Sequence, residues 1–132
     1  MRSLILLLVG LFMGAALTLI GMNYLRRGTS YPEGVMAVMG GQVKGVDDAI
    51  GKNRCSSADL LPRLQTLRYV ADEIEPAFVD MEKDTQFIRY ASDLRAAVDA
   101  SLSAPPASCK AAAAAISQID KTCDACHRDY KN

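Results

Sequence analysis

Two cysteines and the only histidine of the chain form a short motif close to its C-terminus. Cys123, Cys126 and His127 have the spacing C-x-x-C-H, which is the attachment sequence of a c-type haem. Two thiols three residues apart can bond to the two vinyl groups at one edge of the macrocycle, and the imidazole then lies beneath the iron. On a helix, all three side chains share one face. We therefore predict one covalent haem c, with His127 as the proximal iron ligand.

A zinc site and a thiol–disulfide redox pair are two other functions of a C-x-x-C motif. A structural zinc site would need a second pair of ligands nearby, and the remaining cysteines, Cys55 and Cys109, do not form a second C-x-x-C. A redox pair usually follows a strand in a βαβ unit, and the sequence lacks the alternation of apolar and polar residues that predicts strands. Haem attachment is therefore favoured over both.

The apolar residues after position 30 recur every three or four positions, which predicts amphipathic helices. We expect Pro62 in the first turn of the second helix or just before it, and Pro76 directly after its end. The fourth helix has an unbroken apolar seam of Cys109, Ala112, Ile116, Ile119, Cys123, Cys126 and Tyr130. The approximate limits of the four expected helices are Ser30 to Gly51, Leu60 to Ile74, Met81 to Pro105, and Ala107 almost to the C-terminus.

Short loops between these helices favour an all-α fold, an antiparallel up-down-up-down four-helix bundle over residues 30–132. In that topology, the start of the first helix and the end of the fourth lie at the same end of the bundle. Met36, Met39 and Met81 are therefore expected near His127.

The topology brings Cys55 and Cys109 to the opposite end of the bundle. In an oxidising compartment we expect these two residues to form a disulfide. It would close a loop of about 55 residues, worth roughly 4 kcal/mol in the chain-entropy description. The alternative is a pair of buried free thiols.

Residues 1–29 are expected to form a membrane anchor or a signal peptide ahead of the bundle. The 23 residues from Ser3 to Leu25 include no charged side chain, and at about 1.5 Å each they would span a bilayer core of roughly 30 Å. An uncleaved transmembrane helix is favoured over a cleaved signal peptide, because the apolar run continues past the small residues 14–16. Arg26 and Arg27 would then lie on the external side, against the positive-inside tendency.

Either interpretation of residues 1–29 places the bundle outside the cytoplasm, and the favoured anchor places it in the periplasm at the cytoplasmic (inner) membrane of a bacterium. All 15 acidic residues follow position 30, whereas three of the 15 basic residues precede it, so the bundle has a net charge of −3. This charge argues against nucleic acid as a partner. The sequence has no second histidine, no acid–base pair and no phosphate-binding loop, so we do not expect an enzyme.

The C-terminal helix resembles the cytochrome c-prime family, whose members are four-helix bundles with C-x-x-C-H near the end of the last helix. The likeness covers residues 30–132 and is strongest over residues 115–131. Asp129, Tyr130 and Lys131 match the acidic, aromatic and basic positions after the haem histidine, which implies a place for Lys131 beside the haem. Arg128 departs from that pattern. Residues 75–78, Glu-Pro-Ala-Phe, resemble the segment between the second and third helices of the family.

The family resemblance also implies that a residue of the first helix faces the haem from its distal side, and this residue is methionine in low-spin members. Residues 36–41, Met-Ala-Val-Met-Gly-Gly, match from Met36, although Pro32 replaces the arginine that the family has four positions earlier. We take Met36 as the distal ligand, with Met39 as second choice and Met81 as third. The alternative is that these methionines only fill the core.

With methionine and histidine as axial ligands, the predicted function is electron transfer between redox partner proteins. One alternative is a five-coordinate haem that binds NO or CO, and another is a haem relay subunit of a larger respiratory complex. Family members often form homodimers, so a homodimer is also possible.

Overall fold

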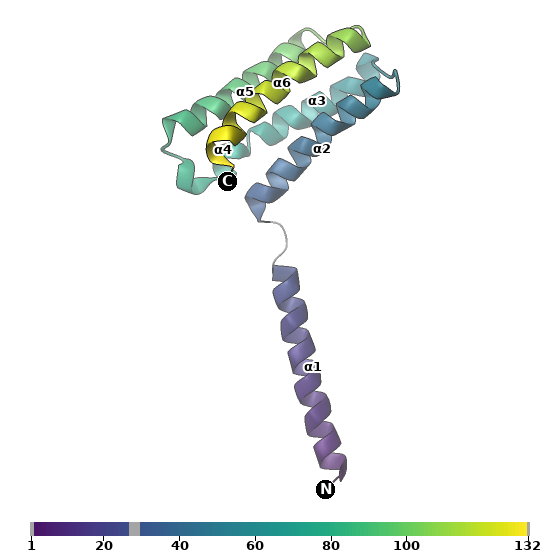
Figure 1. Cartoon of the computed structure of the whole chain (residues 1–132), viewed down its shortest axis with the longest axis vertical. Coiled ribbons are helices and arrows are strands. Elements are labelled where there is room, and N and C mark those ends of the chain that lie inside the picture. Colours follow the sequence, from purple (N-terminus) through teal and green to yellow (C-terminus); the bar gives the residue numbers. More distant parts are fainter. Residues whose placement is uncertain (1, 27–29, 132) are drawn as a thin grey trace. The chain divides into compact units, whose positions relative to one another are not determined.

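The computed structural model describes residues 2–26 and 30–131, with side chains described for 6–22 and 30–131 (Figure 1). The described residues are helical and include no strand, which confirms the all-α class. The chain divides into two compact units, Met1–Ser30 and Tyr31–Asn132. Each unit is described by itself below.

The first unit contains one helix, α1 (Arg2–Arg26). Its side chains from Leu6 to Met22 are all exposed, and Thr18 Oγ1 donates a hydrogen bond of 2.8 Å to the carbonyl of Gly14. Among the described residues, no helix combines the length and the hydropathy needed to cross a membrane. The membrane anchor therefore stays a prediction, and Arg27 lies outside the described residues.

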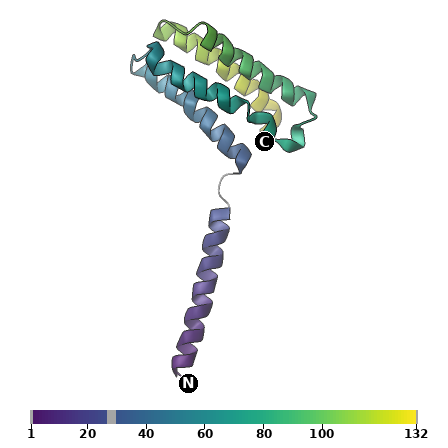
Figure 2. The ribbon, with the colours of Figure 1, turned by 180° about the vertical axis from the view of Figure 1, so that it is seen from behind.

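The second unit is built from four long helices. The long helices are α2 (Tyr31–Gly51), α3 (Ser57–Ala71), α5 (Thr85–Ser103) and α6 (Cys109–Tyr130), and the short α4 (Ile74–Ala77) and η1 (Val79–Met81) connect α3 to α5. Helix α2 packs against α3 and α6, and α5 packs against the same two helices. Consecutive long helices run in opposite directions in both views (Figure 2). These four helices form an antiparallel bundle.

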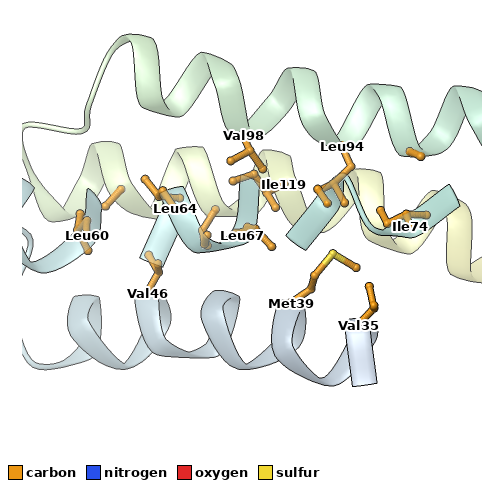
Figure 3. Packing of buried hydrophobic residues seen from close by; sticks show 14 of the residues in the cluster. Val35, Met39, Val46, Leu60, Leu64, Leu67, Ile74, Leu94, Val98 and Ile119 are labelled. Carbon is orange, nitrogen blue, oxygen red and sulfur yellow. The ribbon is translucent and has the colours of Figure 1, made fainter. Parts of the chain in front are cut away.

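The core of the bundle contains the apolar seams that the periodicity predicts for α3 and α5, whereas α2 buries Val35 and Ala49 and leaves Met36, Val43 and Ile50 of its expected seam only partly buried (Figure 3). Leu60, Leu64 and Leu67 of α3 and Ile119 of α6 are almost completely buried. The remaining α6 seam residues divide into buried Ala112 and Ile116, and partly buried Cys123, Cys126 and Tyr130, which pack against the core. One apolar stripe thus runs from the middle of the core to the C-x-x-C-H motif.

Three helix starts differ from the prediction because a polar side chain caps each one. Helix α6 begins at Cys109 rather than near Ala107, after its N-cap Ser108. Helix α3 begins at Ser57 rather than near Leu60, since the Ser56 hydroxyl accepts a hydrogen bond from the backbone N–H of Asp59. Pro62 consequently lies inside α3 and not in its first turn. Helix α5 begins at Thr85, after its N-cap Asp84, so that Met81 belongs to η1 instead.

The end of the second helix was also predicted too late. Helix α3 stops at Ala71, and Ile74 belongs to the separate α4, where it is still buried. Pro76 lies within α4 rather than after the helix that it was expected to end. The first turn of a helix has N–H groups without intrahelical partners, so proline is tolerated there. The end of α2 was predicted correctly, and Asn53 adopts the left-handed conformation that ends helices (φ 57°).

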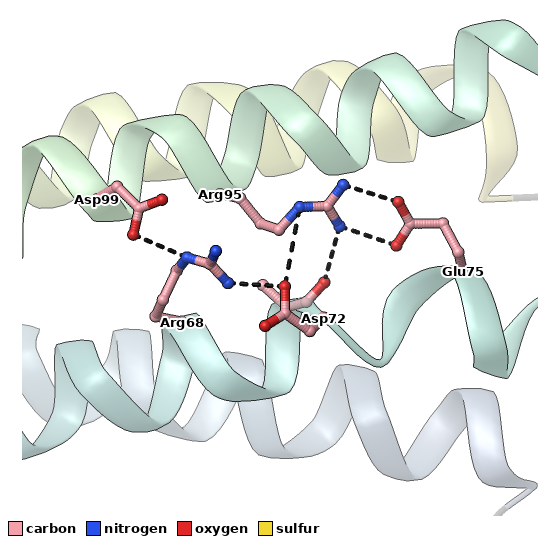
Figure 4. A network of polar contacts seen from close by, with 6 residues as sticks. Arg68, Asp72, Glu75, Arg95 and Asp99 are labelled. Carbon is pink, nitrogen blue, oxygen red and sulfur yellow. Dashed lines mark hydrogen bonds and ion pairs between the residues drawn. The ribbon is translucent and has the colours of Figure 1, made fainter.

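Arginine–carboxylate pairs hold the α3–α4 corner against α5 (Figure 4). Arg95 of α5 donates two hydrogen bonds of 2.8 Å to the Glu75 carboxylate and a third, of 3.2 Å, to the carbonyl of Ala71. Arg68 bonds to Asp72 and Asp99 at 2.7 Å each. The hydrogen bonds from Arg95 lower the pKa of Glu75. Because α4 leads directly into η1, these pairs also help to position the segment that contains Met81.

The far end of the bundle is closed by a covalent bond. Cys55, in the α2–α3 loop, and Cys109, the first residue of α6, form a disulfide with a Cα–Cα distance of 5.1 Å. Their sequence separation is 54 residues. The disulfide lies at the end of the bundle away from Cys123 and Cys126, as the topology predicts.

Replacing Glu75 with Gln is expected to lower the free energy of unfolding at pH 7 by about 1–3 kcal/mol, because a neutral amide is a weaker partner for Arg95. Since the folded-state pKa of Glu75 is lowered, the stabilisation is fully present above the unfolded pKa and is lost as the pH falls through the folded pKa. The difference between the two proteins in urea titrations should therefore shrink as the pH falls below about 4. Glu82→Gln, at an exposed position, is the control. A difference that stays constant with pH would contradict the assignment.

The double substitution Cys55→Ser with Cys109→Ser is expected to lower the free energy of unfolding by roughly 4 kcal/mol, because a long loop of the unfolded chain is no longer closed. Urea titration of both proteins measures the change. Wild-type protein treated with a thiol reductant should reach the midpoint of the double variant, and the double variant should not respond to the reductant. A change below about 1 kcal/mol would show that the disulfide contributes little.

Candidate functional site

The last third of α6 brings the motif to one end of the bundle. Cys123 and Cys126 are free thiols that are half-buried, and both pack against the core. His127 is exposed and lies in the last turn of α6, where its carbonyl accepts a 3.0 Å hydrogen bond from the N–H of Lys131. The apolar seam of α6 therefore determines which face of the helix the two thiols occupy.

Two neighbouring cavities of about 320 and 430 Å³ surround the motif. Met36, Cys126 and His127 border both of them. The first cavity continues along the apolar residues Met39, Val43, Ile74, Ala91, Leu94 and Cys123. The second continues along Ala37, Phe78, Met81, Phe87, Tyr130 and Lys131. Volumes of roughly 300–1,000 Å³ with mostly apolar walls are typical of sites for small molecules and cofactors.

The three predicted distal ligands lie at this end of the bundle, but in different positions. Met36 is half-buried and borders both cavities. Met39 is buried in the core and borders only the first (Figure 3). Met81 borders only the second, together with Lys131. Met36 is therefore the one of the three methionines that shares both cavities with Cys126 and His127.

The two thiols of the motif resist ionisation. Burial, followed by the charges of Asp120 and Asp124, raises the pKa of Cys123 to about 11. Burial and Asp129 also raise the pKa of Cys126. Redox-active C-x-x-C pairs have the opposite property, a thiolate stabilised by a helix N-terminus or a cation. Here the motif is near the C-terminus of α6, where the helix dipole disfavours negative charge.

The described residues give no more support to a zinc site than to a redox-active pair of cysteines. Thiols must lose their protons to bind zinc, and Cys55 and Cys109 are bonded to each other. Within the described part of the chain, no three His, Cys, Asp or Glu side chains gather closely enough to hold a metal ion. The motif presents two largely neutral thiols beside apolar side chains.

Acidic residues lie along the first cavity, where Asp47 of α2 and Asp120 and Asp124 of α6 are among its lining residues. Burial and the two neighbouring aspartates raise the pKa of Asp120. Lys44, also at this cavity, pairs with Asp48 at 2.9 Å.

Sequence reasoning missed a group of polar contacts next to the motif. The Tyr130 hydroxyl donates a 2.7 Å hydrogen bond to Asp84, and the Tyr90 hydroxyl donates one of 2.6 Å to Asp129. A local signal existed for Asp84, since aspartate directly before a helical segment is a common N-cap. No local signal existed for the pairing of Tyr90 with Asp129, which depends on the packing of α5 against α6.

Fold and site together define an all-α domain in which a C-x-x-C-H motif borders two apolar cavities at one end of an antiparallel bundle. Comparisons of the chain with models of protein families, with curated proteins and with solved structures find no match in any of the three. The likeness to the cytochrome c-prime family therefore rests on the motif and its surroundings in the sequence.

In protein produced without haem, alkylation of Cys123 by iodoacetamide is expected to be slow at pH 8 and to accelerate up to a midpoint near pH 11, because only the thiolate reacts. The Cys126→Ser variant isolates the reaction of Cys123, and the Cys123→Ser variant serves as its counterpart. Mass spectrometry against pH gives the midpoint. A midpoint below about 8 would instead indicate an activated redox cysteine.

Proposed function

We propose that residues 30–132 bind one haem c covalently and carry single electrons between redox partner proteins. The observation that supports this proposal is the position of Cys126 and His127, which border both apolar cavities together with Met36. In this proposal Cys123 and Cys126 would form the thioether bonds to the haem, and His127 and Met36 would hold its iron. Bound haem supplies an iron that exchanges one electron, and histidine–methionine ligation raises its reduction potential.

The arrangement of the four cysteines supports covalent attachment. Thioether formation requires two thiols that are not oxidised, and Cys123 and Cys126 are free. The other two cysteines are joined at the far end of the bundle, so correct folding keeps the two pairs apart even in an oxidising compartment. The neutral state of the two thiols also lowers their tendency to oxidise to a disulfide with each other.

Met36 is the best supported distal ligand because, within the described residues, it is the methionine that borders both cavities with His127. Met39 already has a structural role, since its side chain is buried among the core residues. The apolar walls formed by Leu94, Phe87 and their neighbours would keep water away from the bound group. Exclusion of water is one of the factors by which a protein sets a reduction potential.

The proposal includes a membrane-tethered location in the bacterial periplasm. The uncharged stretch of residues 3–25 supports an anchor at the cytoplasmic membrane, and the disulfide supports an oxidising compartment. A tether would raise the effective concentration of the carrier near redox partners in the membrane. Lys131, at the second cavity, is the proposed basic neighbour of the haem.

Optical spectra of the purified full chain test the proposed ligands. The wild type should keep its haem after denaturation and organic extraction, and its reduced form should be low-spin and unable to bind CO. Met36→Leu should become high-spin and bind CO readily, because leucine keeps the volume but lacks the sulfur. Met39→Leu and Met81→Leu are matched controls and should keep the wild-type spectrum.

Other results would contradict parts of this proposal. A wild-type protein that is high-spin and binds CO would support the five-coordinate, gas-binding alternative. If Met36→Leu stays low-spin and Met39→Leu becomes high-spin, Met39 would be the distal ligand instead of Met36. A protein exported with its C-x-x-C-H motif intact but without covalent haem would overturn the proposal as a whole.

A further inference from the structure

The proposed iron ligand His127 lies in the last turn of α6, four residues before its C-cap Lys131, whose N–H donates to the His127 carbonyl at 3.0 Å. The carbonyl groups after His127 have no such regular partners, and helix ends fray for that reason. The direction of the His127 side chain therefore depends on what holds this turn in place.

Two tyrosine–aspartate hydrogen bonds connect this turn to the start of α5. Tyr130 of α6 donates to Oδ2 of Asp84 at 2.7 Å, and Tyr90 of α5 donates to Oδ2 of Asp129 at 2.6 Å. The arrangement is reciprocal, because each helical end contributes one tyrosine and one aspartate. Two donors that point in opposite directions oppose both a rotation and a displacement of the turn that carries His127.

Both hydrogen-bonding partners from α5 are themselves fixed. Oδ1 of Asp84 accepts hydrogen bonds from the backbone N–H groups of Gln86 (2.9 Å) and Phe87 (3.1 Å), which leaves Oδ2 for Tyr130. The Gln86 side-chain amide donates a 2.9 Å hydrogen bond to the Tyr90 hydroxyl. The turn of α6 is thus attached to a capped and ordered helix start rather than to a free side chain.

The rings of the two tyrosines also border the site. Tyr90 lines the first cavity and Tyr130 lines the second, and each does so together with Cys126 and His127. The two rings meet edge to face with centroids 6.2 Å apart, and Tyr130 meets Phe87 in the same way at 5.4 Å. Such contacts stabilise one ring orientation over others.

We propose that Tyr130 and Tyr90 are positioning residues that fix the direction of His127 toward the cofactor, through their bonds to Asp84 and Asp129. This inference rests on the proposed function, since an axial histidine is what the arrangement would orient. The tyrosines do not bind the iron. They restrict the last turn of α6 to one position, and thereby the imidazole to one geometry.

The test uses the full chain with its haem, in the variants Tyr130→Phe, Tyr90→Phe and their combination. Phenylalanine keeps the ring and removes only the hydroxyl. Hydrogen exchange of the amides of residues 127–131 should become about tenfold faster, the ratio that corresponds to about 1.4 kcal/mol. The electron paramagnetic resonance signal of the oxidised haem should broaden or split at unchanged haem content. Tyr69→Phe, at an exposed tyrosine of α3, is the matched control and should change neither measurement.

The possible outcomes separate this inference from the proposed function. A double variant with full haem content and the wild-type resonance signal would overturn the positioning role, even if its amides exchange faster. Unchanged hydrogen exchange of residues 127–131 in the double variant would also overturn the positioning role, because the two hydroxyls would then not hold this turn. A wild type without covalent haem would overturn the proposed function and the positioning role together. If the double variant does not fold, Asp84→Asn replaces it, because asparagine caps helices as well as aspartate but is a poorer acceptor for the Tyr130 hydroxyl.

Discussion

The continuous apolar seam of α6 is the constraint on which both the core and the site depend. Ala112, Ile116 and Ile119 are buried at its first part, and Cys123 and Cys126 continue the same stripe. Because side chains three and four positions apart share one face of a helix, burial of the first part fixes the rotation of α6 about its axis. That rotation brings both thiols to the cavities. Burial of apolar side chains in the core therefore determines where the two thiols of the motif lie.

A second consequence of this packing is the chemical state of the motif. The thiols lie against apolar walls and beside Asp120, Asp124 and Asp129, and both effects raise their pKa values. The same C-x-x-C spacing at a helix N-terminus would have favoured a thiolate. Position along the helix, rather than the spacing of the cysteines, thus favours neutral thiols over thiolates in this chain.

Periodicity in the sequence was sufficient to predict the four long helices, the buried seam of α6 and the end of the bundle at which each methionine lies. It failed at helix starts. The first turn of α3 and the start of α5 are determined by hydrogen bonds from Ser56 and Asp84, and apolar spacing carries no information about such caps. The contact between Tyr90 and Asp129 could not be predicted, because it depends on how two helices pack. Met36 and Met39 fall on one helical face in the sequence, and the structure separates them by their burial and by the cavities that they border.

The disulfide has a mechanical effect on α2 and α6, two of the three long helices that border both cavities. Cys55 follows α2 closely and Cys109 begins α6, so the bond connects the end of one helix to the start of the other at the far end of the bundle. A covalent link there opposes sliding of α2 along α6. We therefore expect the relative motion of these two helices to be mainly a spreading of their opposite ends, where Met36 and His127 lie. Such a motion would change the width of the site more than the register of its two walls.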